Sequence, residues 1–197
     1  MSQSPTSIYA YSLDRCIDPF SVDFGPDDVV WADIAHALAG TMRFRGGLGT
    51  RCWLSVAEHS VHVAEKCSPE HALYGLLHDA AEAYLTDVPR PQTGSIYIAQ
   101  GPEVSEYAAI HDRVLGVILA KAGLDPVIPS EVLRIDDRMA ATEINAYCGA
   151  GFPRGGLAEP YPGRGGRAFF TPEPPAVAQK SFLRALYGLL RIAQVAP

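Results

Sequence analysis

Apolar residues at helical spacing are the feature that most constrains how this chain can fold. They recur at positions i, i+3, i+4 and i+7 in a series of segments, most of which end at a glycine or a proline. We therefore expect helices over about residues 28–39, 55–67, 69–88, 103–122, 129–148 and 176–193. Because helices follow one another along most of the chain, the pattern predicts an all-α fold.

The chain has the size of a single domain. With 197 residues, 48% of them hydrophobic, it can bury a substantial core. We expect one domain over residues 1–197, with a helical core over 27–148 and a closing helix over 176–193. The stretch 149–175 is rich in glycine and proline, which predicts a long loop before that helix. Residues 8–11 predict a short strand or hairpin near the N-terminus.

The sequence carries no signal for a membrane or for an oxidising compartment. No uninterrupted apolar run reaches the length of a membrane span, and the N-terminus lacks a basic region followed by an apolar run. We expect a soluble, cytoplasmic protein. The cysteines are widely spaced and form no CxxC pair, so neither a zinc knuckle nor a disulfide framework is indicated; they are Cys16, Cys52, Cys67 and Cys148.

The acidic net charge argues against long nucleic acid as a partner but is compatible with a small phosphate ester. A formal net charge of −6 disfavours long nucleic acid, because binding a phosphate backbone calls for a broad basic surface. A small phosphate ester needs only a local basic patch, and Arg43, Arg45 and Arg51 lie close together in the sequence. A solvated arginine loop would explain the same spacing.

Residues with metal-ligand chemistry fall on three separate predicted helices. They are His59, the adjacent pair His78 and Asp79, and Asp137. Imidazole together with carboxylate suits a divalent first-row transition metal. His59 lies at the edge of an apolar stripe with Val56 and Val63, and a core histidine satisfied by a hydrogen bond is the alternative interpretation.

Asp137 is predicted to lie in the middle of an apolar helix face. Its neighbours at helical spacing are Leu133, Ala140, Ala141 and Ile144. Burial of an unpaired carboxylate costs several kcal/mol, so we expect a cation or hydrogen-bond donors there. A structural salt bridge is the alternative. Asp136 shares a face with Glu143, and we expect it to point outward or to pair with an arginine.

Two further carboxylates lie close to the His-Asp pair in the sequence. Glu82 comes four residues after His78, so both share a helix face, and Glu82 can position or deprotonate a metal-bound water. Asp87 lies where this helix is expected to end, just before Val88 and Pro89, and capping of a turn is its alternative role.

Taken together, these elements resemble the HD-domain deoxynucleotidases, a group whose phage and prophage relatives include dATP triphosphohydrolases. The resemblance spans about residues 27–145 and rests on the order and spacing of Arg43-Phe44, Ser55–Ser60, Leu77–Glu82, Asp87–Pro89 and Asp137. It implies an HD-domain helical bundle. It also implies that His59, His78, Asp79 and Asp137 are the metal ligands, that Glu82 is the catalytic acid/base and that Asp87 assists it.

The same resemblance bears on the substrate. It implies that Arg43 contacts phosphate and that the ring of Phe44 lies against the sugar, with Arg51 as a further candidate for phosphate binding. Close relatives often have tryptophan at the aromatic position, and ordinary core packing is the alternative for Phe44. Guanosine-tetraphosphate hydrolases carry Glu-Asp where this chain has Glu82-Ala83, which disfavours that activity.

The expected function is a metal-dependent phosphohydrolase that cleaves deoxynucleotides by attack of a metal-bound water. The resemblance implies one tightly held divalent ion (Mn, Co, Zn, Ni or Fe), because binuclear HD enzymes need extra histidines between the central pair and the last aspartate, and only His111 lies in that interval. Recruitment of a second ion by the substrate is the alternative. We expect a small-molecule nucleotide as substrate and a homo-oligomer. These residues do not decide between cleavage of dNMPs and cleavage of dNTPs. Arg164 and Arg167 could hold the extra phosphates of a triphosphate, or they could lie in an exposed loop. The alternatives are a non-catalytic HD module that binds nucleotide or metal, and an all-helical scaffold.

Overall fold

Helices dominate the part of the chain that the structure describes. The computed structural model describes residues 6–44, 50, 52–88, 95–100, 103–152, 155–162 and 171–195. Its longer helices are α1 (Trp31–Gly40), α3 (Val56–Lys66), α7 (Tyr107–Lys121), α8 (Ser130–Tyr147) and α9 (Pro175–Val195). Two short helices, α4 (Ala72–Leu77) and α5 (Glu82–Leu85), lie between α3 and α7. The predicted all-α class is confirmed.

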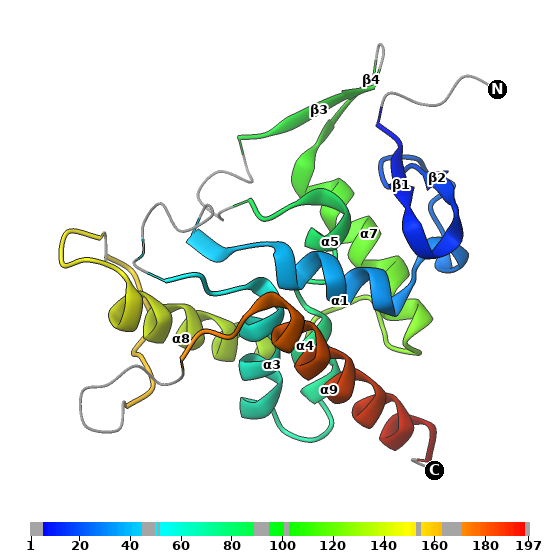
Figure 1. Cartoon of the computed structure of the whole chain (residues 1–197). Helices are drawn as coiled ribbons and strands as arrows, with labels where there is room; N and C mark the ends of the chain where they lie inside the picture. Colours follow the sequence, from blue (N-terminus) through cyan, green and yellow to red (C-terminus); the bar gives the residue numbers. More distant parts are fainter. Residues whose placement is uncertain are drawn as a thin grey trace.

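Within the described ranges, two small antiparallel hairpins and two 3₁₀ turns accompany the helices. Near the N-terminus β1 (Ile8–Ala10) pairs with β2 (Arg15–Ile17), which confirms the predicted N-terminal β element. The second hairpin pairs β3 (Tyr97–Gln100) with β4 (Glu103–Glu106) and was not predicted. The 3₁₀ turns are η1 (Tyr11–Leu13) and η2 (Pro26–Asp28). In Figure 1 both hairpins lie at the upper side of the helical body.

Helix α3 is the centre of the bundle. It packs against α1, α4, α8 and α9, and α9 also covers α1 (Figure 1). The main core joins α1, α3, α4 and α9 with α7 through fully buried side chains, among them Ile34, Leu38, Leu76, Ile118, Phe182 and Leu186. No helix in the described ranges is long and apolar enough to cross a membrane.

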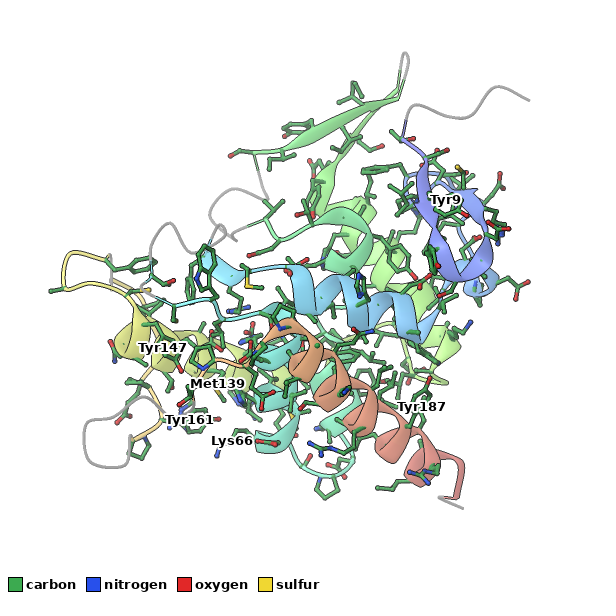
Figure 2. The ribbon with its side chains drawn as sticks, in the orientation of Figure 1. Tyr9, Lys66, Met139, Tyr147, Tyr161 and Tyr187 are labelled. Atoms are coloured by element: carbon green, nitrogen blue, oxygen red, sulfur yellow. The ribbon has the colours of Figure 1, made fainter. Side chains whose placement is uncertain are left out.

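A second, smaller apolar cluster fixes how α8 crosses α3. It consists of Val63 from α3 with Val132, Ile135 and Met139 from α8. Figure 2 shows Met139 where the two helices cross, and its side chain is completely buried. This contact determines which face of α8 points toward α3, and therefore which of its polar residues reach the interior.

Two helix boundaries differ from the prediction for local reasons. The helix expected over 69–88 is divided, because between α4 and α5 the amides of Ala80 and Glu82 bond to carbonyls three residues back. The helix expected over 103–122 begins only at Tyr107, because residues 103–106 pair with β3. In contrast, the start of α3 agrees with the prediction: Ser55 and Glu58 form a reciprocal capping box.

Candidate metal centre

Two buried histidine rings face each other inside the bundle. His59 comes from the first turns of α3, and His78 directly follows the last residue of α4. The ring centroids lie 5.3 Å apart, and the two residues are 0% and 7% exposed. Buried polar nitrogens normally have hydrogen-bond or metal partners, so the contacts of each nitrogen indicate the role of the ring.

Each ring has its Nδ1 engaged by an atom that can only accept a hydrogen bond. Nδ1 of His78 lies 2.8 Å from the carbonyl oxygen of Gly75. Nδ1 of His59 lies 2.7 Å from Oε1 of Glu143. The carbonyl of Gly75 can only accept, so Nδ1 of His78 carries a proton, and a proton on Nδ1 of His59 is donated to Glu143 in the same way. When each ring is neutral, this tautomer directs its Nε2 lone pair at the space between the rings. This arrangement is typical of metal-binding histidines, whose outer nitrogen donates to a carbonyl or a carboxylate.

Two carboxylates complete the cluster. Oδ2 of Asp79 lies 3.3 Å from Nε2 of His78 and 3.8 Å from Nε2 of His59. Oδ1 of Asp136 lies 2.9 Å from Nε2 of His59 and 3.7 Å from Nε2 of His78. One ligand atom from each of His59, His78 and Asp79 lies within 4.8 Å of the other two. The donor set of two imidazoles and two carboxylates fits a divalent first-row transition ion.

The fourth member of the cluster is Asp136 and not Asp137. Asp137 was predicted as a ligand, but its side chain is exposed on α8, whereas Asp136 is only 5% exposed. The physical reason is the burial of the neighbours of Asp136: Val132 and Met139, at positions i−4 and i+3, are both 0% exposed. Leu133, which supported the prediction for Asp137, is 50% exposed.

The carboxylates dominate the electrostatics of the histidines. Burial lowers the pKa of His59 and Arg43 lowers it further, but Glu143 and Asp136 outweigh both and raise it to about 9. Burial likewise opposes protonation of His78, yet the carboxylates of Asp79 and Asp136 raise its pKa. Burial raises the pKa of Asp136, but the two histidines hold it well below its usual value. The cluster thus concentrates negative charge that a cation can neutralise.

Glu82 lies beside this cluster with its carboxyl group shielded from water. Its Oε2 is inaccessible to solvent and has no hydrogen-bond partner among the described residues. Burial raises its pKa well above the usual value, and the carboxylates of Asp79 and Asp87 raise it further. Asp79 and Asp87 thus both lie close enough to Glu82 to affect its pKa. A carboxyl group with a raised pKa is suited to proton transfer near neutral pH.

The backbone that leads from Glu82 to Asp87 adopts an unusual conformation. Thr86 has a φ of 70°, which a β-branched residue rarely adopts. The buried hydroxyl of Tyr107 donates a hydrogen bond to the carbonyl of Thr86 at 2.9 Å, and it also lies 3.3 Å from the carbonyl of Leu85. Tyr107 thereby holds the turn that carries Asp87, a role that the sequence analysis did not identify.

Arg43 reaches the cluster, and Phe44 lies next to it. Nε of Arg43 donates to Oε2 of Glu143 at 2.9 Å, and a terminal nitrogen lies 3.5 Å from Oδ2 of Asp79. The guanidinium lies 5.5 Å from the ring centroid of Phe44, which makes an edge-to-face contact at 6.1 Å with Phe152 from the loop after α8. The other candidate phosphate-binding arginines lie outside the described residues: Arg45, Arg51, Arg164 and Arg167.

Glu143 and Phe152 were missed as site residues. Glu143 comes seven residues after Asp136 and so shares its helix face, which is the sequence signal that could have identified it. Asp136 on that face was expected to point outward or to pair with an arginine; Glu143 is 0% exposed and pairs with Arg43. No local signal marks Phe152, because its contact with Phe44 spans more than a hundred residues.

Comparison with known proteins gives relatives but no activity. No protein-family model matches the chain. It is 36% identical over 117 residues to the uncharacterized protein YfdR of Escherichia coli, covering 59% of this chain and 60% of the relative. It is 33% identical over 120 residues to an uncharacterized protein of Rhodobacter capsulatus, covering 57% of this chain and 58% of the relative. The chain thus spans about three fifths of the length of these curated relatives.

Proposed function

We propose that the chain is a divalent-metal-dependent phosphohydrolase of the HD-domain type that acts on deoxynucleotides. The observation that carries this proposal is the convergence of two histidine Nε2 atoms, each with its Nδ1 already engaged, on the carboxylates of Asp79 and Asp136. A core histidine needs only one satisfied nitrogen and no converging carboxylates. A metal site needs all of these features.

The residues that would hold the metal are His59, His78, Asp79 and Asp136. Mixed nitrogen and oxygen ligation suits Mn, Co, Zn, Ni or Fe, and a second ion would be recruited with the substrate. When bound, such an ion supplies a Lewis acid that polarises a phosphate oxygen and lowers the pKa of coordinated water.

Glu82, assisted by Asp87, would transfer the proton of the attacking water. Burial and the carboxylates of Asp79 and Asp87 raise the pKa of Glu82 and thus favour the protonated carboxyl group. A cation bound at the cluster would favour the ionised form of Glu82. Glu82 could then accept a proton from the attacking water and return it to the leaving group. Asp87, whose carboxylate affects the pKa of Glu82, would help to orient that water.

Arg43 would bind the scissile phosphate, and Phe44 would face the sugar. The guanidinium already lies beside Asp79, so a phosphate held by the arginine also approaches the cluster. An aromatic ring against the sugar gives a 2′-hydroxyl no hydrogen-bond partner, which favours deoxynucleotides. The contact between Phe44 and Phe152 supports an apolar wall at this position.

A substrate screen tests the proposal. We expect the full-length protein with Mn²⁺, Co²⁺ or Zn²⁺ to release phosphate from dNMPs, or triphosphate from dNTPs, faster than from the corresponding ribonucleotides. Chromatography of the products distinguishes the two leaving groups. Metal binding without any product would indicate a non-catalytic module instead, and absence of metal binding would leave only a helical scaffold.

Replacement of Glu82 by alanine tests the assignment of the proton-transferring residue. We expect Glu82→Ala to lower kcat by a factor of at least about 10² to 10⁴, because a positioned acid/base contributes that much. The bound metal measured by mass spectrometry of the purified protein is expected to stay unchanged, since Glu82 is not one of the ligands. A Glu82→Ala variant with wild-type turnover would contradict its catalytic role.

A further inference from the structure

Glu143 is a buried carboxylate whose two oxygens serve two different partners. Oε1 lies 2.7 Å from Nδ1 of His59, and Oε2 accepts a hydrogen bond from Nε of Arg43 at 2.9 Å. The side chain is 0% exposed. Because the guanidinium of Arg43 is a cation, Glu143 forms a buried ion pair with it.

The two partners belong to the two halves of the proposed site. His59 contributes a nitrogen to the metal cluster, whereas Arg43 is the cation placed to meet a phosphate. Arg43 has a second anionic neighbour, because its terminal nitrogen lies 3.5 Å from Oδ2 of Asp79. If Glu143 lost its charge, the buried guanidinium would retain Asp79 as its nearest anion, and it would then compete with a metal for that oxygen.

We propose that Glu143 is a positioning residue that ties the metal ligand His59 to the phosphate-binding Arg43, and this inference rests on the proposed function. Through Oε1 it keeps the proton on Nδ1 of His59 and directs Nε2 into the cluster. Through Oε2 it holds Arg43 at Nε, which leaves the terminal nitrogens of the guanidinium for an anion and holds the nearer of them 3.5 Å from Oδ2 of Asp79. One rigid carboxylate on α8 thus sets the spacing between metal and phosphate.

Glu143→Gln tests the inference, because glutamine keeps the shape but cannot accept at both ends. The probes are Co²⁺, followed by its visible absorption, and inorganic phosphate added to the Co²⁺-saturated protein. We expect Co²⁺ affinity to fall by about 10- to 100-fold, the usual effect of losing the outer partner of a metal-bound histidine. We also expect phosphate affinity at saturating Co²⁺ to fall at least about tenfold, because a charge-assisted contact to the arginine is lost.

The matched control is Glu131→Gln on the same helix. Glu131 accepts hydrogen bonds from the amide and hydroxyl of Ser68, at 3.2 Å and 2.7 Å, and takes no part in the cluster. This variant is expected to bind Co²⁺ and phosphate like the wild type. A folded Glu143→Gln protein that binds both probes as tightly as the Glu131→Gln protein would overturn the inference.

A measurement on the wild-type protein covers the case in which Glu143→Gln does not fold. In the nitrogen-15 NMR spectrum of the Zn²⁺-loaded protein, His59 is expected to keep its proton on Nδ1 and to show the shift of a metal-bound nitrogen at Nε2. Metal bound through Nδ1 would overturn the inference, since Glu143 could not then hold that atom.

Wild-type turnover separates this inference from the proposed function. If the wild type hydrolyses no nucleotide but Glu143→Gln weakens both probes, the proposed function fails and the positioning role of Glu143 holds. If the wild type hydrolyses deoxynucleotides and Glu143→Gln binds both probes normally, the inference alone is overturned. In the active case we also expect Glu143→Gln to raise KM more than Glu131→Gln does.

Discussion

Asp136 and Asp137 are adjacent carboxylates of one helix with opposite surroundings, and they offer a matched pair of variants. Asp136 contacts His59 at 2.9 Å, whereas the side chain of Asp137 is exposed. We expect Asp136→Asn to weaken Mn²⁺ binding by more than about 100-fold, because losing a direct ligand costs more than losing an outer partner. We expect Asp137→Asn to retain wild-type affinity. Calorimetric titration of both variants with Mn²⁺ shows which aspartate is the ligand. Weaker Mn²⁺ binding by Asp137→Asn than by Asp136→Asn would identify Asp137 as the ligand.

A second prediction at the residue scale concerns acid stability and His62. Burial lowers the pKa of His62 to about 4, below the value of about 6.5 for an exposed histidine. The unfolded chain therefore binds this proton more readily, and the associated stability, present above pH 6.5, is lost as the pH falls toward 4. Between pH 7 and pH 5 this costs about 2 kcal/mol.

The His62→Gln variant measures this contribution. Its free energy of unfolding, from urea titrations at pH 7 and pH 5, is expected to fall by about 2 kcal/mol less than that of the wild type over the same interval. The measurements use metal-free protein, so that proton competition at the metal ligands is the same in both. Equal losses in the two proteins would show that His62 titrates normally in the folded state.

The sequence predicted single residues well where their role was local. His59, His78 and Asp79 come together as expected, and Glu82 lies beside them. The prediction failed at Asp136 because Leu133, taken as part of the buried face, is exposed, whereas Val132 and Met139 place Asp136 on the face that is buried. Glu143 is buried because His59 and Arg43 neutralise it, and those partners lie 84 and 100 residues away in the sequence. Such pairing is invisible to any rule that considers one helix at a time.

At the scale of elements, the close packing of α3 against α4 determines where His78 lies. Gly75 on α4 approaches α3 so closely that an added Cβ would lie 2.7 Å from Sγ of Cys67 and 3.1 Å from Cα of Ala64. The carbonyl of the same glycine accepts the hydrogen bond from Nδ1 of His78. The helix contact and the orientation of the ligand therefore depend on one residue.

Gly75→Ala is expected to lower the free energy of unfolding by about 1–3 kcal/mol, the usual cost of overpacking. That cost outweighs the gain of up to about 1 kcal/mol that alanine brings inside a helix. Gly188→Ala on α9 is the control, since an added Cβ there meets nothing within 4 Å, and it is expected to be neutral or stabilising. Urea titration measures both. A Gly75→Ala protein as stable as Gly188→Ala would contradict the close approach of the two helices.

Element type was predictable from the sequence, whereas interruptions within elements were not. Periodicity identified the positions of the longer helices because each buries one apolar stripe. It could not identify the break after Leu77, because residues on both sides continue the same apolar spacing. The break lies only in the backbone, where amides bond to carbonyls three residues back and not four. Nor could periodicity detect β4, a four-residue strand whose stability comes from pairing with β3.

At the scale of the whole molecule, the candidate ligands join three parts of the chain that are far apart in sequence. His59 lies on α3, His78 and Asp79 in the turn between α4 and α5, and Asp136 on α8. A metal bound to all of them would cross-link these parts, and the unfolded chain offers no comparable site. Metal binding is therefore expected to stabilise the whole domain and not one local segment.

Thermal unfolding with and without Mn²⁺ tests this expectation. Mn²⁺ is preferable to Zn²⁺ because it binds thiolates weakly, so the four cysteines of the unfolded chain do not compete for it. At a free Mn²⁺ concentration of about 100 times the Kd, stability is expected to rise by about 2.7 kcal/mol. For a domain of this size that corresponds to an increase in Tm of roughly 5–10 °C.

The Asp136→Asn and Asp137→Asn variants distinguish the site from general salt effects. The Tm of Asp137→Asn is expected to rise with Mn²⁺ as in the wild type, because its metal ligands are intact. The Tm of Asp136→Asn is expected to stay nearly constant at the same concentration. A rise of equal size in both variants would mean that Mn²⁺ stabilises the protein elsewhere, since removal of the ligand carboxylate from α8 removes the link that a bound metal would form between that helix and α3.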